Sequence, residues 1–382
     1  MKIISVVGAR PNFMKVAPFI KAIEKYNENS NEHIDHVLVH TGQHYDERMS
    51  GSFFSSLNIP YPDINLNIGS GTHAEQVGNT MIEFEKVCIE QQPDWVVVIG
   101  DVNATIACSI TAKKLHIKVC HIEAGLRSGD IEMPEEINRL VTDRLSDLLL
   151  IPDRLSEQNL IKEGADKQNI VMVGNIMIDT LDANLAKAQQ LSLSEVLRNN
   201  HHKEQNQLLS ITANNYAVLT MHRPSNVDDA GILEGIVNFI IDEIAPVMPV
   251  VWTVHPRAEK QLKTFNLWSK ITSCDAIQLL YPLGYHDMLR LNKDAKIMIT
   301  DSGGLQEECT VLGTRCLTMR WNTERPVTLK ENGGASVLVG NNVERLKEEF
   351  NIILKEDAHS ARPEMWDGKT AMRCVKAIVN HR

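Results

Sequence analysis

The chain has 382 residues, with 39 Lys or Arg against 49 Asp or Glu, and its formal net charge is −10. A composition of 43% hydrophobic and 23% charged residues is typical of a folded globular protein, and this length predicts two or three domains. The acidic balance argues against a general binder of nucleic acid or of anionic membranes, because phosphates would be repelled. It leaves room for a local basic pocket that binds a phosphorylated small molecule.

The predicted elements alternate between short apolar strands and amphipathic helices. In chain order, we expect strands at 3–7, 36–40, 95–99, 118–122, 148–151 and 170–173, and then at 216–220, 250–254, 277–280, 297–300, 315–318 and 336–339. We expect helices at 14–26, 73–91, 104–115, 135–145, 176–190, 231–244 and 305–312. Continuous apolar strands that alternate with helices predict the α/β class, with parallel sheets covered on both faces.

The stretch 197–215 is polar, rich in Asn and Gln, and without periodicity, which is typical of an exposed connection. His201 and His202 would then be solvated linker residues. We therefore expect a first Rossmann-like, doubly wound domain over 1–190, a connection over 191–215 and a second such domain over 216–365. Two such halves would face each other across a cleft.

Several polar residues follow the predicted strands of the first half, where open α/β sheets bind ligands. Arg10 and Lys15 would flank a helix N-terminus, a favourable place for phosphate; the alternative is two solvated surface cations. Asp101, Glu123 and Glu135 lie after strands or at a helix start. One such carboxylate is usually a helix cap, but three on one rim are harder to explain by structure alone, because like charges raise one another's pKa and need a reason to be together.

The second half offers an anion-binding pattern. Ser302, Gly303 and Gly304 connect a strand to a helix, so that backbone N–H groups and a hydroxyl would face an anion. Glu308, one turn further on, would accept hydrogen bonds from ribose hydroxyls, or would simply favour the helix dipole. With His222 and Arg325, the cations of the first half would complete a site for a diphosphate.

Two other patterns are weaker. Residues 69–74 match a dinucleotide-binding fingerprint in letters, but they do not follow a buried strand. His33, His36, His40 and His44 have metal-like spacing, but they straddle a turn, a strand and a loop and would diverge. We expect neither a metal nor a redox cofactor.

A short apolar start, no bilayer-length apolar stretch and seven Cys without a CxxC pair predict a cytoplasmic protein with reduced thiols, away from membranes.

The assembled motifs resemble those of the non-hydrolysing UDP-N-acetylglucosamine 2-epimerases. The matching segments are GARP at 8–11 with Lys15, TGQH at 41–44, GD at 100–101, HIEAGLR at 121–127, PEEINR at 134–139, HR at 222–223, DSGGLQEE at 301–308 and TERP at 323–326. Their order and spacing agree from residue 3 to about residue 340.

This resemblance implies a glycosyltransferase-B-like fold in which a C-terminal helix, residues 366–382, joins the first domain. It implies reversible conversion of UDP-GlcNAc to UDP-ManNAc through a 2-acetamidoglucal, without a cofactor, in a homodimer that supplies surface polysaccharide synthesis. By position, the catalytic residues would be Asp101, Glu123, Glu135, Lys15 and His222. The substrate-binding residues would be Arg10, Gln43, His44, Arg139, His255, Ser302, Gly303, Gly304, Glu308 and Arg325.

The sequence also departs from the family pattern. Asp46 and Gly69 stand where members activated by UDP-GlcNAc have Gln and Arg, which argues against activation of that kind, and Arg257 replaces a frequent Asn. The GARP and GDVN forms also occur in relatives that act on UDP-2,3-diacetamido sugars. A hydrolysing epimerase, a glycosyltransferase of the same fold and a silent UDP-sugar binder remain as alternatives.

Overall fold

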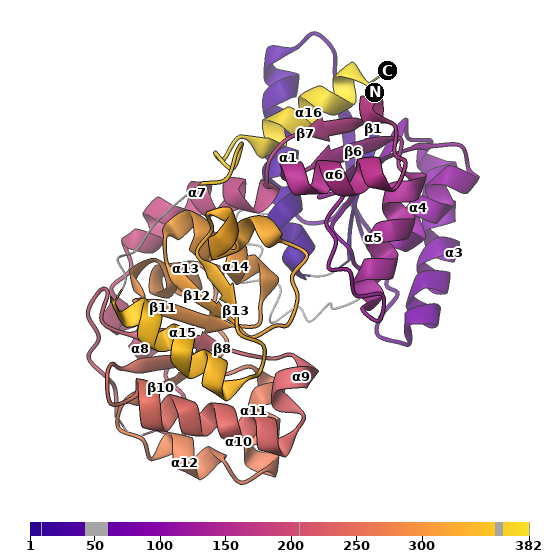
Figure 1. The fold of residues 1–382 in the computed structure, drawn as a ribbon. Coiled ribbons are helices and arrows are strands. Elements are labelled where there is room, and N and C mark those ends of the chain that lie inside the picture. Colours follow the sequence, from indigo (N-terminus) through magenta and orange to yellow (C-terminus); the bar gives the residue numbers. More distant parts are fainter. Residues whose placement is uncertain (9, 43–59, 206, 356–361, 382) are drawn as a thin grey trace. The chain divides into compact units, whose positions relative to one another are not determined.

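A computed structural model describes residues 1–8, 10–42, 60–205, 207–355 and 362–381. The chain forms two compact units (Figure 1), Met1–Ala183 with Glu364–Arg382, and Asn184–Pro363. The first unit therefore ends a few residues before the expected residue 190 and takes back the C-terminal segment. The placement of one unit relative to the other, and with it the expected cleft, stays a prediction.

The first unit is built on a seven-stranded sheet in the order β3-β2-β1-β4-β5-β6-β7, in which every neighbouring pair is parallel. Its strands are β1 (Lys2–Val7), β2 (Asp35–His40), β3 (Ile64–Asn65), β4 (Trp95–Ile99), β5 (Lys118–Ile122), β6 (Leu148–Ile151) and β7 (Ile170–Met172). All five residues of β4 are buried. A strand covered on both faces needs apolar side chains throughout, which explains the continuous run.

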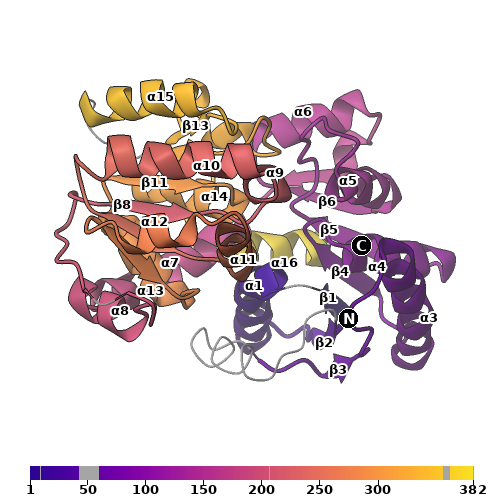
Figure 2. The ribbon, with the colours of Figure 1, turned by 90° about the horizontal axis from the view of Figure 1, so that it is seen from below.

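Helices cover both faces of this sheet (Figures 1 and 2). They are α1 (Arg10–Asn29), α3 (His73–Gln91), α4 (Asn103–Lys114), α5 (Pro134–Leu145), α6 (Arg154–Lys162), α7 (Ile176–Gln189, which runs into the second unit) and α16 (Thr370–Asn380). On one face, Val96 and Val98 share a core with Phe84 of α3 and Cys108 of α4. On the other, α1 packs on β1 and β4, and α16 lies against α1.

The second unit has a six-stranded parallel sheet in the order β10-β9-β8-β11-β12-β13. Its strands are β8 (Ala217–Thr220), β9 (Val250–Thr253), β10 (Ile277–Leu280), β11 (Ile297–Thr300), β12 (Arg315–Thr318) and β13 (Ser336–Leu338). Its helices are α8 (Leu193–Asn199), α9 (Pro224–Val227), α10 (Ala230–Phe239), α11 (Pro256–Thr264), α12 (Trp268–Thr272), α13 (Tyr285–Asp294), α14 (Gly303–Leu312) and α15 (Val343–Lys355). Two apolar clusters, one centred on Trp252 and the other on Met298, hold it together.

The expectation that His202 is a solvated linker residue is wrong, although most residues of 197–215 are exposed. Leu197, His202 and Gln205 are buried, and α8 occupies part of the segment. The reason is the edge of the second sheet, where β10 has no neighbour on one side. The backbone N–H of His202 donates to Leu279 O at 3.0 Å, and Gln205 Nε2 donates to Ile277 O at 2.7 Å. Polar residues in this segment therefore cover a strand edge that would otherwise be open.

The structure also differs from the expected elements in the ends of two helices, and it contains elements that were not expected. The helix expected at 231–244 is α-helical only to Phe239 and continues as a π-helical turn, Ile240–Ile244. The C-terminal helix begins at Thr370 rather than at residue 366. The sequence analysis did not assign β3, α6, α8, α9, α11, α12, α13 and α15. In the described part of the chain, no helix has the length and apolar character needed to cross a membrane.

Candidate active site

In the first unit, an ion pair lies where β5 ends. Lys15 Nζ donates to Glu123 Oε2 at 2.5 Å, and both side chains are buried. Gly100, which follows β4, lies against this pair: a Cβ at Gly100 would be 3.4 Å from Lys15 Nζ and 3.7 Å from Glu123 Oε2. The predicted catalytic residues Lys15 and Glu123 are therefore brought together.

Glu123 carries two marks of a functional group. Its φ is 74°, in the left-handed region that costs free energy for a residue with a side chain. Its Oε1 is buried and has no hydrogen-bond partner in the described structure. A buried carboxylate normally has both oxygens satisfied. This strained backbone and this free acceptor are costs to stability that a role in chemistry would explain.

Asp101 is held by the start of α5. Arg139 Nη1 donates to Asp101 Oδ2, and Asn138 Nδ2 donates to the Asp101 carbonyl at 2.8 Å. Arg139 also bonds Glu136 through Nη2 at 2.6 Å. Burial raises the pKa of Glu136, but backbone N–H groups of the 128–129 loop and Arg139 more than offset it, and its pKa lies below the ordinary value. The guanidinium of Arg139, expected to contact substrate, is therefore occupied by two carboxylates and orients Asp101.

The remaining predicted residues of this unit have different outcomes. Glu135 lies in the first turn of α5 with an exposed side chain, and no described residue bonds its carboxylate. Arg10 begins α1, but its side chain, like the whole of Gln43, His44 and Asp46, lies outside the described residues. The structure thus joins Lys15 with Glu123 and Arg139 with Asp101, but it does not bond Glu135 to either group.

In the second unit, a buried aspartate orients His222. His222 Nδ1 lies 2.8 Å from Asp301 Oδ1, and the His222 and Arg223 backbone N–H groups donate to Oδ2 at 2.8 Å. Burial raises the pKa of Asp301, but His222 and the backbone donors outweigh it and lower the net pKa. The ring of His255 lies 5.4 Å from that of His222. Asp301, which the sequence analysis did not assign as a site residue, therefore positions the predicted catalytic His222.

An anion-binding arrangement lies at the start of α14. Ser302 is the N-cap residue, but its hydroxyl makes no hydrogen bond to the helix. Beside it, Gly303 approaches a cluster of ionised side chains, since a Cβ there would lie 3.0 Å from Arg325 Nη1 and 3.4 Å from Arg320 Nη1. First-turn N–H groups together with two guanidinium groups attract a negative charge.

Those guanidinium groups are set in place by two buried acids. Arg325 Nε lies 2.6 Å from Glu307 Oε1 in an ion pair, and Arg320 Nη2 donates to Glu324 Oε2 at 2.5 Å. Arg325 Nη1 also bonds Glu324. Burial raises the pKa of Glu324, but Arg325 and Arg320 outweigh it, so that the net pKa lies well below the ordinary range. Only the motif around Arg325 was visible in the sequence; the network was not.

Glu308 is buried one turn into α14. Burial raises its pKa to about 7, against an opposing effect of hydrogen bonds from Tyr285 and Asn292. The ionised carboxylate accepts hydrogen bonds from ligand hydroxyls more strongly than the protonated group does, because a charged acceptor makes the stronger hydrogen bond. The protonation state of Glu308 therefore changes near neutral pH.

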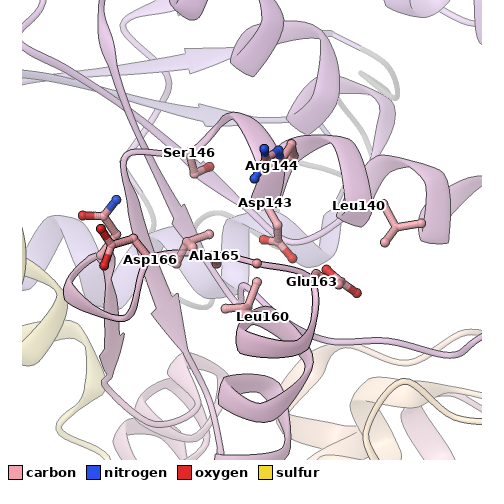
Figure 3. Close-up of a pocket in the computed structure, with 11 residues that line it drawn as sticks. Leu140, Asp143, Arg144, Ser146, Leu160, Glu163, Ala165 and Asp166 are labelled. Atoms are coloured by element: carbon pink, nitrogen blue, oxygen red, sulfur yellow. The ribbon is translucent and has the colours of Figure 1, made fainter.

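A cavity of about 460 Å³ lies elsewhere in the first unit, between α5 and the turn after α6 (Figure 3). Asp143 and Glu163 line it, and both carboxylates are already paired with Arg127. None of the predicted site residues lines this cavity. Among the described residues, no group of three or more His, Cys, Asp or Glu is arranged to hold a metal ion.

Comparison with known proteins identifies the family to which this chain belongs. The family model described as UDP-N-acetylglucosamine 2-epimerase matches residues 27–379. This chain belongs to that family. The epimerase family predicted from the motifs is thereby confirmed, and the protein is an isomerase.

Relatives cover the whole chain. The UDP-N-acetylglucosamine 2-epimerase of Methanocaldococcus jannaschii is 41% identical over 380 residues, 99% of each chain. The crystal structure of that enzyme with UDP-GlcNAc and UDP superposes with a TM-score of 0.86 over 100% of both chains. The UDP-2,3-diacetamido-2,3-dideoxy-D-glucuronate 2-epimerase of Pseudomonas aeruginosa is 38% identical over 89% of this chain and 88% of its own. The predicted glycosyltransferase-B-like pair of parallel-sheet domains is confirmed.

Proposed function

We propose that this protein epimerises UDP-GlcNAc at C2 of the sugar and gives UDP-ManNAc reversibly. UDP leaves as the C2 proton is removed, a 2-acetamidoglucal forms, and UDP adds back after a proton is delivered to the opposite face. The observation that carries this proposal is Glu123, a buried carboxylate with one unbonded oxygen and a strained backbone beside Lys15 in an epimerase-family chain.

The chemistry explains why such a group is needed. The C2 hydrogen has no neighbouring carbonyl, so its removal would leave an unstabilised carbanion unless the leaving group departs at the same time. Positioned carboxylates contribute general acid–base catalysis of about 10²–10⁴-fold. In this proposal Asp101, Glu123 and Glu135 move protons at C2, while Lys15 balances the charge of Glu123.

The leaving group needs cations and N–H donors. We assign the diphosphate to the start of α14, where Ser302, Gly303 and Arg325 lie, and the ribose to Glu308. His222, oriented by Asp301, would donate to the phosphate as charge develops on it. The proposal requires that a nucleotide held by the second unit present its sugar to the carboxylates of the first.

Proton NMR in D₂O with purified protein and UDP-GlcNAc alone tests this function. We expect reversible formation of UDP-ManNAc with deuterium at C2. Accumulation of free UDP and ManNAc would instead indicate a hydrolysing epimerase. An unchanged spectrum would indicate a glycosyltransferase that lacks its acceptor, or a UDP-sugar binder, and would contradict the proposal.

A second substrate is a UDP-2,3-diacetamido-2,3-dideoxy sugar. The observation in its favour is the 38% identity to the Pseudomonas aeruginosa epimerase named for such a compound. The ratio of kcat/KM for the two UDP-sugars decides between them. We expect this ratio to favour UDP-GlcNAc, because the relative with the higher identity, the Methanocaldococcus jannaschii enzyme at 41%, is named for that substrate.

The setting of the reaction completes the proposal. We infer a cytoplasmic homodimer that supplies surface polysaccharide synthesis and uses no metal or redox cofactor. Light scattering during gel filtration measures the oligomeric state. We expect full turnover after dialysis against a chelator and without added nicotinamide, because the proposed reaction uses neither a metal nor a redox cofactor.

A further inference from the structure

Behind the two carboxylates of the first unit lies a buried histidine that the proposed chemistry does not use. His121 is fully buried in β5. Its Nε2 lies 2.9 Å from the Gly100 carbonyl oxygen, and its Nδ1 lies 2.6 Å from Asp143 Oδ1. Both neighbours of the ring are thus oxygen atoms.

The two oxygen atoms determine the protonation state of the ring. A carbonyl oxygen can only accept, so Nε2 must carry a hydrogen. Burial raises the pKa of Asp143, but His121 and Arg127 outweigh it and bring the net pKa below the ordinary value. An ionised carboxylate also only accepts, so Nδ1 must carry a hydrogen as well. A neutral imidazole has one N–H and cannot satisfy both neighbours.

The charges around the ring support this state. Asp143 Oδ2 lies 2.7 Å from Arg127 Nη1 in an ion pair and accepts from the Gly125 backbone N–H at 3.0 Å. The positive charge of Arg127 is shared with Glu163, at 2.6 Å. The row His121, Asp143, Arg127 and Glu163 therefore alternates in sign, and it leaves no buried charge without an opposite neighbour.

This row touches the backbone next to two of the three predicted acid–base groups, Asp101 and Glu123. His121 bonds the carbonyl of Gly100, which has a φ of 72° and directly precedes Asp101. Asp143 bonds the N–H of Gly125, two residues after Glu123. The Glu123 loop needs such support, since Glu123 itself has a left-handed backbone. One pair of side chains thus fixes the two turns that carry the carboxylates.

We propose that His121 is a positioning residue, an imidazolium that donates from both ring nitrogens and, with Asp143, holds the Asp101 and Glu123 turns in their reactive geometry. The inference rests on the proposed epimerase function for its effect on turnover. Its structural part, the doubly protonated ring, does not depend on that function.

Nitrogen-15 NMR of the histidine rings tests the charge directly. In wild-type protein at pH 7.5 we expect both ring nitrogens of His121 to show imidazolium shifts, because both face oxygen acceptors. His36 is the internal control, because burial lowers its pKa to about 4 and it should be neutral in the same spectra. A neutral His121 at pH 7.5 would overturn the proposal.

The variant His121→Gln tests the effect on turnover and identifies the NMR signal by its absence. We expect kcat to fall about 10- to 100-fold, as for a small displacement of reacting groups, while the Kd for UDP stays within about twofold. His202→Gln replaces an equally buried histidine of the second unit and should leave both constants near wild type. Wild-type kcat in His121→Gln would overturn the positioning role.

Two further measurements keep the outcomes separate. If His121→Gln does not fold, Asp143→Asn should shift the His121 signals out of the imidazolium range, and unshifted signals would contradict the proposed pairing. Wild-type turnover of UDP-GlcNAc is measured first. If the wild type does not turn over, the proposed function fails, whereas the ring-nitrogen shifts still decide the state of His121.

Discussion

The carboxyl ends of the two sheets use buried charge in opposite ways. In the first unit, buried cations form ion pairs with the predicted acid–base carboxylates: Lys15 pairs with Glu123, and Arg139 pairs with Asp101. In the second unit, buried acids serve cations: Glu307 and Glu324 hold Arg325, and Asp301 holds His222. The same sheet architecture therefore presents carboxylates at one rim and anion-attracting groups at the other.

This contrast separates chemistry from binding. Strained or unsatisfied groups that cost stability are expected where bonds are made and broken. Glu123 has both properties, and it lies in the first unit. Helix N–H groups and fixed guanidinium groups bind phosphate in its ground state. We therefore expect variants of the first-unit carboxylates to change kcat and variants at the start of α14 to change the affinity for UDP.

The largest expected effect is in the first unit. Glu123→Gln and Asp101→Asn should each lower kcat by about two orders of magnitude or more, because an amide cannot accept the proton. UDP should bind each variant as it binds the wild type. Rates follow from the C2-deuterium assay and Kd from calorimetry. Glu83→Gln, on the exposed face of α3, is the matched control; normal rates in both amide variants would mean that the carboxylates only cap structure.

A smaller effect is expected from a methyl group at the start of α14. In Gly303→Ala the new Cβ would lie 3.0 Å from Arg325 Nη1 and 3.1 Å from Glu324 Oε1, so the guanidinium must move. We expect the Kd for UDP to rise about tenfold, the value of one charge-assisted hydrogen bond. At Gly78 no atom lies within 4 Å of an added Cβ, so Gly78→Ala serves as control. An unchanged Kd with a lowered kcat would reverse the proposed division of roles.

A fall in pH should weaken the binding of UDP by a comparable factor. Because the pKa of Glu308 is raised to about 7, its carboxylate is lost as pH falls from 8 to 6. UDP affinity should then fall about tenfold, one pH unit below the pKa. Calorimetry across this range measures it. Glu308→Gln should bind UDP more weakly and should show a flatter pH profile; an equally steep profile in this variant would exclude Glu308 as the cause.

The same group makes a stability prediction. The folded state holds the Glu308 proton more tightly than the unfolded state, whose pKa is near 4.5. The stabilisation from this group is therefore full below pH 4.5 and is lost as pH rises through 7. Relative to Glu308→Gln, the wild type should lose up to roughly 3 kcal/mol of unfolding free energy over that range. Urea denaturation of both proteins at several pH values measures the difference.

The smallest effect on turnover is expected in the core. Val97 in β4 is fully buried, so Val97→Ala should lower the free energy of unfolding by about 1–2 kcal/mol. Turnover per folded molecule should stay near that of the wild type. A large loss of kcat with little loss of stability would mean that the sheet itself, and not the loops after its strands, controls the chemistry.

The strands could be predicted because each is a run of consecutive apolar residues, which indicates burial on both faces. Trp95–Ile99 and Ile297–Thr300 agree with the expected ranges, since a fully covered parallel strand must be apolar throughout. Short polar helices such as α11 and α12 have no comparable signal. The segment around His202 was misread because its polar residues bond an open strand edge, a contact that depends on a strand about 75 residues away in the chain.

The site residues were found by their place after strands, and that reasoning names a residue without giving its partners. It placed Glu123, His222 and Ser302 at strand ends, but it did not identify Asp301, Asp143 or His121 as supports. Those partners come from other elements, up to 79 residues away for His222 and Asp301. Local spacing carries no information about such pairs, whereas the turn that presents a side chain is a local property.

Because the C-terminal helix belongs to the first unit, the last residues of the first unit are synthesised after the second unit is complete in sequence. Asp179 accepts the backbone N–H groups of Thr370 and Ala371 at 3.0 and 2.8 Å, and Trp366 Nε1 donates to Pro152 O at 3.0 Å. Those partners of Asp179 and Pro152 leave the ribosome about two hundred residues later. The second unit is one continuous segment and does not need that helix, whereas the carboxylate-bearing unit must wait for it. A chain that ends at Pro363 would therefore present a finished second unit and an incomplete acid–base unit.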